Sequence, residues 1–241
     1  MGTGTRLTFA LQAGTKTSTL VGKGIYSVPL AARLTRVSQR RIRCWLKRVP
    51  AEGGTKRTPV WEGEHQPIAS KIVLGFLDLQ EVRFVQAFLS IGLSWKEIRA
   101  AHDKARRRYE TEHPFCTRTF VTDGKHILEE VQTGARSAAY EEIARSQSVF
   151  ADVVRPFIKD LDFSEDQRFA RWWPLGKERK VVLDPDRSFG QPIISERGVP
   201  TQVLYRAIKA GDSQRDVADW YEVKESDVRD AIDFEEWLLA A

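Results

Sequence analysis

Two short amphipathic segments joined by a three-residue turn constrain this chain more than any other feature of its sequence. Ser27 can cap a first helix, and Pro29 suits the first turn of that helix. The turn is Thr35-Arg36-Val37, and Ser38 then caps a second helix from Gln39 to Arg48. Helices of this length cannot bury their apolar faces alone, so they must cross on a third element. The sequence therefore predicts a helix-turn-helix in this segment.

The second helix of this pair carries the positive charge expected of a helix that reads DNA. Gln39 and Arg40 at its beginning can reach base edges in the major groove. Arg43 and Lys47 are better placed to contact phosphates and to set the register on the duplex. A solvated basic helix on an ordinary surface is the alternative interpretation. The predicted DNA-binding residues are Ser38, Gln39, Arg40, Arg41, Arg43, Lys47, Arg48, Lys56 and Arg57.

The segment after this helix, from Val49 to Ile72, is rich in Gly and Pro and is expected to form a loop or a short hairpin. Its basic tip, Thr55-Lys56-Arg57-Thr58, suits a wing that lies along the DNA backbone. A plain flexible linker is the competing interpretation.

Charge is distributed unevenly along the chain. Residues 1–60 contain 12 Lys and Arg and one acidic residue, whereas residues 201–241 contain 5 Lys and Arg and 10 acidic residues. A polyanion should therefore dock near the N-terminus, where basic side chains displace counterions from phosphates, and be repelled by the C-terminal part. This polarity favours two partners at two ends of the molecule.

A second pair of helices is predicted after the basic segment. Asp78 and Glu81 resemble a capping box that begins a helix from Leu79 to Ser90. Ser94 and Glu97 begin the next helix, which runs to about Arg108. His102 in that helix is expected at the surface or the edge of the core rather than as a metal ligand, because no second His or Cys stands at helical spacing.

These segments resemble the winged helix-turn-helix of MerR-type regulators. The similarity is carried by residues 26–34, by Val37-Ser38-Gln39-Arg40-Arg41 and by Gly92-Leu93-Ser94-Trp95, and it covers roughly residues 24–108. It implies a DNA-binding domain with a second helical pair. The chain departs from that family because no sustained heptad and no metal-binding set of cysteines follows.

The middle of the chain predicts two hairpins and a helix. Asp123-Gly124 is the expected turn of a hairpin over residues 118–128. Ala138 to Asp160 is expected to be helical, and a second hairpin should pair Phe169–Trp173 with Lys180–Leu183. The Trp172-Trp173 pair is expected to pack in the core or in an interface.

Three helices are predicted at the end of the chain, over Thr201–Ala210, Ser213–Tyr221 and Ser226–Leu239. Asp212 or Ser213 should cap the second helix, and Ser226 or Glu225 should begin the third. The third helix is acidic, so phosphate would be repelled and helical shape alone does not make it a second DNA reader. The predicted partner-binding residues are Asp230, Asp233, Glu235, Glu236 and Trp237.

Several short motifs in residues 180–239 resemble the domain of unknown function 433, a group of prokaryotic proteins associated with toxin–antitoxin pairs. They include Val182-Leu183-Asp184-Pro185, Gly190-Gln191-Pro192 and Gly198-Val199-Pro200. The resemblance implies an antitoxin of the VapB kind, whose partner is a PIN-like ribonuclease and which represses its own operon. The alternative is a stand-alone MerR-type regulator without a toxin.

The sequence thus predicts a mainly α fold with small β hairpins, in which a winged helix-turn-helix precedes a C-terminal three-helix unit. The expected division is a flexible arm (1–23), a DNA-binding domain (24–110), a linker or dimerisation region (111–178) and an antitoxin-type domain (179–241). Operator DNA, a cognate toxin and a second copy are the expected partners. Neither a catalytic set, nor a cofactor, nor a metal site can be assembled from the residues, and a cytoplasmic location is expected.

Overall fold

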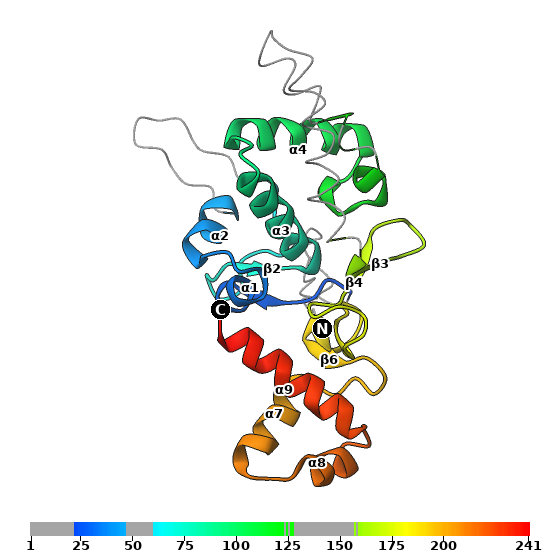
Figure 1. The fold of residues 1–241 in the computed structure, drawn as a ribbon. Coiled ribbons are helices and arrows are strands. Elements are labelled where there is room, and N and C mark those ends of the chain that lie inside the picture. Colours follow the sequence, from blue (N-terminus) through cyan, green and yellow to red (C-terminus); the bar gives the residue numbers. More distant parts are fainter. Residues whose placement is uncertain (1–21, 47–59, 123, 125, 128–156, 158) are drawn as a thin grey trace, which may run out of the picture.

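The chain folds into an elongated arrangement of helices with small antiparallel sheets among them (Figure 1). The computed structural model describes residues 22–46, 60–122, 124, 126–127, 157 and 159–241. Its helices are α1 (Val28–Thr35), α2 (Gln39–Leu46), α3 (Phe76–Ser90), α4 (Trp95–Tyr109), α7 (Thr201–Ala210), α8 (Gln214–Trp220) and α9 (Glu225–Leu239), with 3-10 turns η1 (Pro114–Cys116) and η2 (Ser188–Gly190). Its strands are β1 (Tyr26–Ser27), β2 (Val73–Leu74), β3 (Leu161–Phe163), β4 (Phe169–Trp172), β5 (Val181–Leu183) and β6 (Pro192–Ile194). The predicted class, mainly α with small β hairpins, is confirmed.

The first two helices begin where their sequence signals predict. The hydroxyl of Ser27 accepts a hydrogen bond from the amide of Leu30 at 3.3 Å and so caps α1. Arg36 ends α1 in the left-handed conformation, with a φ of 59°. Val37 in the turn is almost fully buried, and this burial fixes the angle at which α2 leaves α1.

The second helix packs through two apolar side chains. Ile42 and Trp45 of α2 are buried, and the ring of Trp45 stacks on that of Trp95 of α4 with centroids 5.7 Å apart. The predicted residues Lys47 and Arg48 of this helix lie outside the described residues, as do Lys56 and Arg57 of the predicted wing.

The helix α3 begins three residues earlier than the sequence predicted. Asp78 occupies the third helical position, where its carboxylate accepts a hydrogen bond from the amide of Gly75 at 2.8 Å. Gly75 is the cap and offers no side chain, so the sequence carries no side-chain capping signal at this start. The predicted capping box of Ser94 and Glu97 at the start of α4 is confirmed.

The predicted hairpin over residues 118–128 is wrong, because residues 118–122, 124 and 126–127 are helical. Thr117 caps this helix by accepting a hydrogen bond from the amide of Phe120 at 3.1 Å. Phe120 and Ile127 are seven residues apart and both fully buried, a spacing that places them on one helix face. A Cβ on Gly124 would lie 2.7 Å from the ring of Phe120, so this glycine serves close packing rather than a turn.

The other predicted hairpin is confirmed and belongs to a larger sheet. Strands β3, β4, β5 and β6 pair antiparallel in chain order, with Trp172 opposite Leu183. Trp172 packs in the core as predicted, and the guanidinium of Arg83 from α3 lies 4.1 Å from the centre of its ring. The predicted helix over Ala138–Asp160 lies almost entirely outside the described residues.

The three C-terminal helices follow the prediction closely and form the lower end of the molecule in Figure 1. The hydroxyl of Ser213 accepts a hydrogen bond from the amide of Asp216 at 3.1 Å and caps α8. Lys224 is the cap of α9, and the carboxylate of Asp227 accepts from its amide at 3.1 Å. Glu225 is therefore the first residue of α9, one of the two starts that the sequence left open.

Candidate nucleic-acid and partner-binding surfaces

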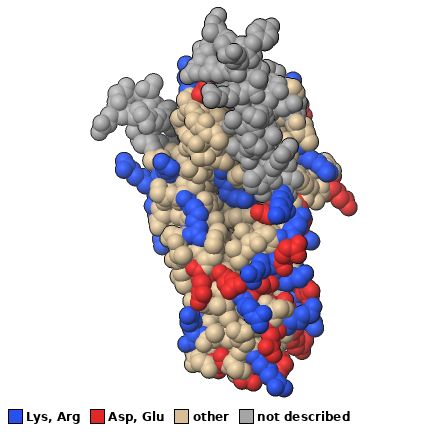
Figure 2. Space-filling view, in the orientation of Figure 1, with Lys and Arg blue, Asp and Glu red and all other residues tan. Residues whose placement is uncertain are grey.

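The polar face of α2 carries the predicted DNA-binding side chains that lie among the described residues. Ser38, Gln39, Arg40, Arg41 and Arg43 are all exposed, while Ile42 and Trp45 on the other face are buried. Figure 2 shows Lys and Arg side chains along the left edge of the molecule, at the height of α2 in Figure 1. Packing of one face thus presents the basic face to solvent.

Local hydrogen bonds order part of this basic face. The amide of Arg41 donates to the hydroxyl of Ser38 at 3.4 Å, which caps the first turn. The guanidinium of Arg43 donates to the side-chain oxygen of Gln39 at 3.0 Å, and that of Arg41 donates to Gln86 of α3 at 3.2 Å. The first turn of α2 contains no acidic residue. An anion approaching the beginning of α2 therefore meets exposed cations and free amides.

A tight two-residue turn lies within residues 49–72, for which the sequence predicts a loop or a short hairpin, but not at the predicted basic tip. The amide and carbonyl of Ile68 exchange hydrogen bonds with those of Lys71 at 3.0 and 2.9 Å. Ala69 and Ser70 between them have φ values of 48° and 62°, as a type I′ turn requires. The turn precedes β2, which pairs with β1 directly before α1. Its exposed Lys71 is an additional basic side chain two residues before β2.

The turn between α1 and α2 contacts the C-terminal helix. The guanidinium of Arg36 lies 4.3 Å from the centre of the Trp237 ring and donates to the backbone carbonyl of Trp237 at 2.5 Å. This carbonyl is one of the last four of α9, whose end carries partial negative charge. Arg33 of α1 also acts on α9, since its charge opposes the rise that burial causes in the pKa of Glu235.

Two of the predicted partner-binding carboxylates, those of Asp230 and Glu235, are buried. Asp230 is 8% exposed and accepts hydrogen bonds from the side chain of Arg179 at 2.8 Å and from the amide of Lys180 at 2.9 Å. Glu235 is 7% exposed and accepts from the hydroxyl of Thr201 at 2.5 Å. Their oxygens accept hydrogen bonds within the chain.

The remaining members of that set are more accessible but also make internal contacts. Asp233 accepts a hydrogen bond from Arg179 at 2.7 Å, and Glu236 is exposed with one oxygen 3.8 Å from the ammonium of Lys209. Trp237 is partly buried beneath Arg36. Most side chains on this face of α9 therefore contact residues near the sheet or near α1.

A second contact connects β1 and the residue before it to the segment between β5 and β6. The hydroxyl of Tyr26 donates to the carbonyl of Gly190 at 2.8 Å, and the amide of Ile25 donates to the carbonyl of Phe189 at 2.9 Å. Tyr26 is fully buried, and burial raises the pKa of its hydroxyl well above the usual value. Gly190 has a φ of 76° and would place a Cβ 2.4 Å from the Tyr26 hydroxyl. Only glycine fits at position 190 without a displacement of the Tyr26 side chain or of the backbone.

A group of ionisable side chains is buried between α3, α4 and the loops beside them. Asp78 accepts hydrogen bonds from the indole of Trp61 at 2.8 Å and from the amides of Glu64 and Gly75. His102 is fully buried, 3.7 Å from a carboxylate oxygen of Glu81, so its predicted place at the surface or core edge is wrong. Burial lowers the pKa of His102 to about 3, which leaves its imidazole neutral near pH 7, and burial raises the pKa of Glu81 well above its usual value.

This buried group does not have the arrangement of a metal site. Within the described ranges, no three His, Cys, Asp or Glu side chains are placed to hold a metal ion together. Its polar contacts join α3 and α4 to the preceding loop.

Among the described residues, no helix has the length and the apolar character needed to span a membrane.

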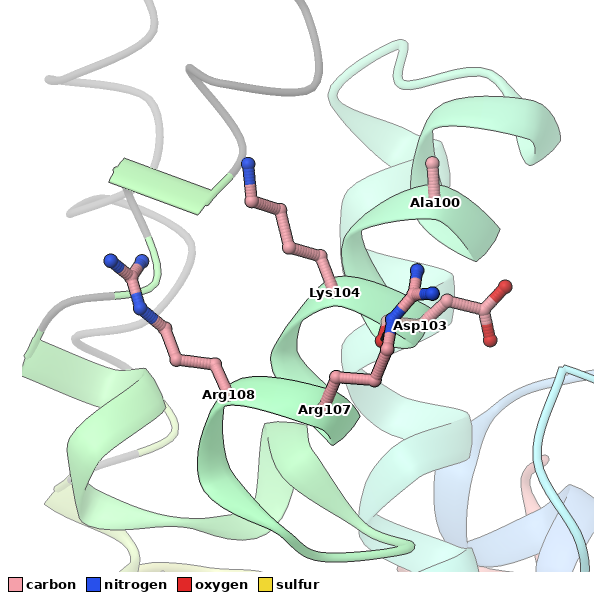
Figure 3. Close-up of a pocket in the computed structure, with 5 residues that line it drawn as sticks. All are labelled: Ala100, Asp103, Lys104, Arg107 and Arg108. Carbon is pink, nitrogen blue, oxygen red and sulfur yellow. Dashed lines mark hydrogen bonds between the residues drawn. The ribbon is translucent and has the colours of Figure 1, made fainter.

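An open depression of about 770 Å³ lies along α4. It is lined by Ala100, Asp103, Lys104, Arg107 and Arg108 (Figure 3). The guanidinium of Arg107 donates to the backbone carbonyl of Asp103 at 3.2 Å, and Figure 3 shows Arg108 extending away from this pair. Only one of the lining side chains is apolar, whereas small-molecule sites are mostly apolar. The depression has the character of a charged surface.

Comparisons with known proteins find similarity over most of the chain. Residues 181–234 match the family model described as "Protein of unknown function (DUF433)". The chain is 24% identical over 222 residues to a protein of Mycobacterium tuberculosis (strain ATCC 25618 / H37Rv) named "Putative antitoxin VapB45". The matched region spans 87% of this chain and 92% of that protein. It also resembles the crystal structure of RV2018 from Mycobacterium tuberculosis, with a TM-score of 0.67 and 24% identity, over 86% of this chain and 96% of the other. The fold is thus shared with a solved structure, and the chain is similar in sequence to an antitoxin-like protein.

Proposed function

We propose that this chain is a DNA-binding antitoxin of a type II toxin–antitoxin system. In this proposal it neutralises a PIN-like ribonuclease toxin and represses its own operon. The observation that carries the DNA-binding half is the exposed row of Gln39, Arg40 and Arg43 on a capped helix whose other face is buried. The similarity to a protein named as an antitoxin supports the other half.

In the DNA complex, α2 lies in the major groove. Gln39 and Arg40 at its beginning contact base edges, and Arg41 and Arg43 contact phosphates on either side. Lys47, Arg48, Lys56 and Arg57 lie outside the described residues, and the proposal includes them as further phosphate contacts. The exposed Lys71 adds a further phosphate contact. Affinity should fall steeply with salt because these contacts release counterions.

The active form on DNA is a homodimer. One short recognition helix provides too few contacts for operator affinity, and two half-sites about one helical turn apart supply the rest. Residues 111–178 are the proposed dimerisation region, between the DNA-binding part (24–110) and the antitoxin-type part (179–241).

The toxin binds at the acidic end of the chain. A ribonuclease must attract RNA phosphates, so its RNA-binding groove is basic and complements a surface rich in carboxylates. Residues 201–241 have twice as many acidic as basic residues. Asp233 and Glu236 keep accessible oxygens on α9 and are candidate contacts of this surface.

The test is co-expression of the full chain with the protein encoded by the adjacent gene. We expect the two to elute as one complex in size-exclusion chromatography and the complex to lack the ribonuclease activity of the free partner. A chain that binds its promoter but forms no complex would instead be a stand-alone regulator of MerR type.

A further inference from the structure

An exposed tryptophan marks the end of α8. Trp220 is 64% exposed, and Tyr221 beside it is 36% exposed. Large aromatic side chains that stay in water are uncommon, whereas tryptophan and tyrosine are enriched among the residues that dominate protein–protein binding. We name Asp216, Asp219, Trp220, Tyr221 and Glu222 the α8 patch.

The backbone holds this patch in a fixed conformation. Val217 and Ala218 are buried and anchor the inner face of α8. The amide of Tyr221 donates to the carbonyl of Val217 at 3.2 Å, and the amide of Val223 donates to that of Ala218 at 3.0 Å. Trp220 is therefore presented on an ordered turn. An aromatic side chain on an ordered turn loses little conformational entropy on binding.

The charge around Trp220 identifies the chemistry of its partner. Residues 212–227 contain six acidic and two basic residues. Asp216 precedes Trp220 by four positions and shares its side of the helix, and Asp219 and Glu222 are exposed on either side of the two aromatic residues. One oxygen of Glu222 lies 3.8 Å from the guanidinium of Arg197, so the excess negative charge of the patch comes from Asp216 and Asp219. Nucleic acid and anionic lipid would be repelled from such a surface. A basic protein surface with an apolar pocket is complementary to it.

A second copy of the chain fits the patch poorly. A twofold interface brings the same surface of both copies together, so the carboxylates of one patch would face those of the other. The patch also lies far from the basic helix. In Figure 1, α8 is at the lower end of the molecule and α2 is in the upper half. A protein bound to α8 can therefore coexist with DNA bound to α2.

We propose that the α8 patch is the surface through which this chain binds its toxin. In this complex, Trp220 inserts into an apolar pocket within a basic face of the toxin. This inference rests on the proposed function and names the contact residues that the function requires. It places the main contact on α8 rather than on Asp230 and Glu235, the buried carboxylates of α9 that accept hydrogen bonds within the chain.

The experiment measures binding of the full chain to the protein encoded by the adjacent gene by titration calorimetry. Trp220→Ala should weaken binding by roughly 30-fold or more, as expected for a central aromatic contact. Asp219→Lys should slow association and reduce its dependence on salt. The matched controls are Phe189→Ala, which removes an aromatic side chain that is 53% exposed, and Glu165→Lys, which reverses an exposed charge in the turn between β3 and β4. Both controls should bind within about 3-fold of the unchanged chain, as surface changes outside an interface do.

Each outcome decides one of the two ideas. If the unchanged chain binds but Trp220→Ala and Asp219→Lys bind equally well, the patch is wrong and the antitoxin function stands. If the unchanged chain does not bind at all, the antitoxin function fails and the patch loses its partner with it. If Trp220→Ala instead turns a dimer into a monomer in light scattering, the patch is a self-association surface and the proposal is overturned. Circular dichroism of each variant confirms that the fold is retained.

Discussion

The guanidinium of Arg36 stacks on Trp237 at 4.3 Å and donates a hydrogen bond to its backbone carbonyl, across 201 positions of sequence. Arg36 lies in the turn that sets the angle of the basic helix, and Trp237 lies in the last turn of the C-terminal helix. The turn between α1 and α2 and the C-terminal helix are therefore in direct contact. The orientation of α2 depends in part on a residue of the acidic end.

Replacing Arg36 by Ala should lower the free energy of unfolding by about 1 kcal/mol, because an exposed cation–π contact and one charge-assisted hydrogen bond are lost. Urea denaturation measures this change. Arg40→Ala is the matched control, since Arg40 is an exposed arginine on the neighbouring helix, and its effect should stay within about 0.5 kcal/mol. Equal stabilities of the two variants would show that the contact with Trp237 contributes nothing.

Replacing Gly190 by Ala should be more damaging than the same change at Gly92. Both glycines have a positive φ, but a Cβ at Gly190 would lie 2.4 Å from the Tyr26 hydroxyl, whereas nothing lies within 4 Å of one at Gly92. We expect a loss of about 1 kcal/mol at Gly92 from backbone strain alone and at least about 2–3 kcal/mol at Gly190. Thermal unfolding of the two variants side by side makes the comparison. Similar losses of stability in the two variants would mean that the contact between Tyr26 and Gly190 rearranges at little cost in free energy.

Acid should destabilise the protein through His102. Burial lowers its folded-state pKa to about 3 from the ordinary 6.5, so the unfolded chain binds more protons between these values. The stability that neutral His102 contributes is complete above pH 6.5 and is lost progressively as the pH falls toward 3. The free energy of unfolding should therefore fall between pH 7 and pH 5, by on the order of 1–2 kcal/mol from this residue. In His102→Gln this fall should be smaller by that amount. Identical pH dependence of the unfolding free energy in the two proteins would mean that His102 is exposed to solvent.

The parts of the fold that sequence predicted well carry their information locally. Ser27, Ser94 and Ser213 each begin a helix because a hydroxyl three residues before an amide can satisfy it, and such pairs are visible in the sequence. The exposed basic face of α2 and its buried partners Ile42 and Trp45 follow from helical period in the same way.

The errors came from signals that mislead locally or that do not exist in the sequence. Asp123-Gly124 suggested a turn, but the seven-residue spacing of the buried Phe120 and Ile127 was the better indicator of a helix. The burial of Asp230 and Glu235 depends on Arg179 and Thr201, which lie 51 and 34 positions away. No local sequence pattern distinguishes an acidic side chain that accepts hydrogen bonds from a distant part of the chain from one that is exposed and can bind another protein. The predicted domain boundaries at 110 and 178 remain predictions.

The central claim is that the basic face of α2 reads a specific duplex. Fluorescence anisotropy should measure the affinity of the full chain for the DNA upstream of its own coding sequence and for a shuffled duplex of the same composition, at about 150 mM salt. We predict a preference for its own DNA of about 1,000-fold, reduced about 10-fold or more by Arg40→Ala and unchanged by Arg215→Ala on the acidic end. Equal affinity of the unchanged chain for both duplexes would contradict the account.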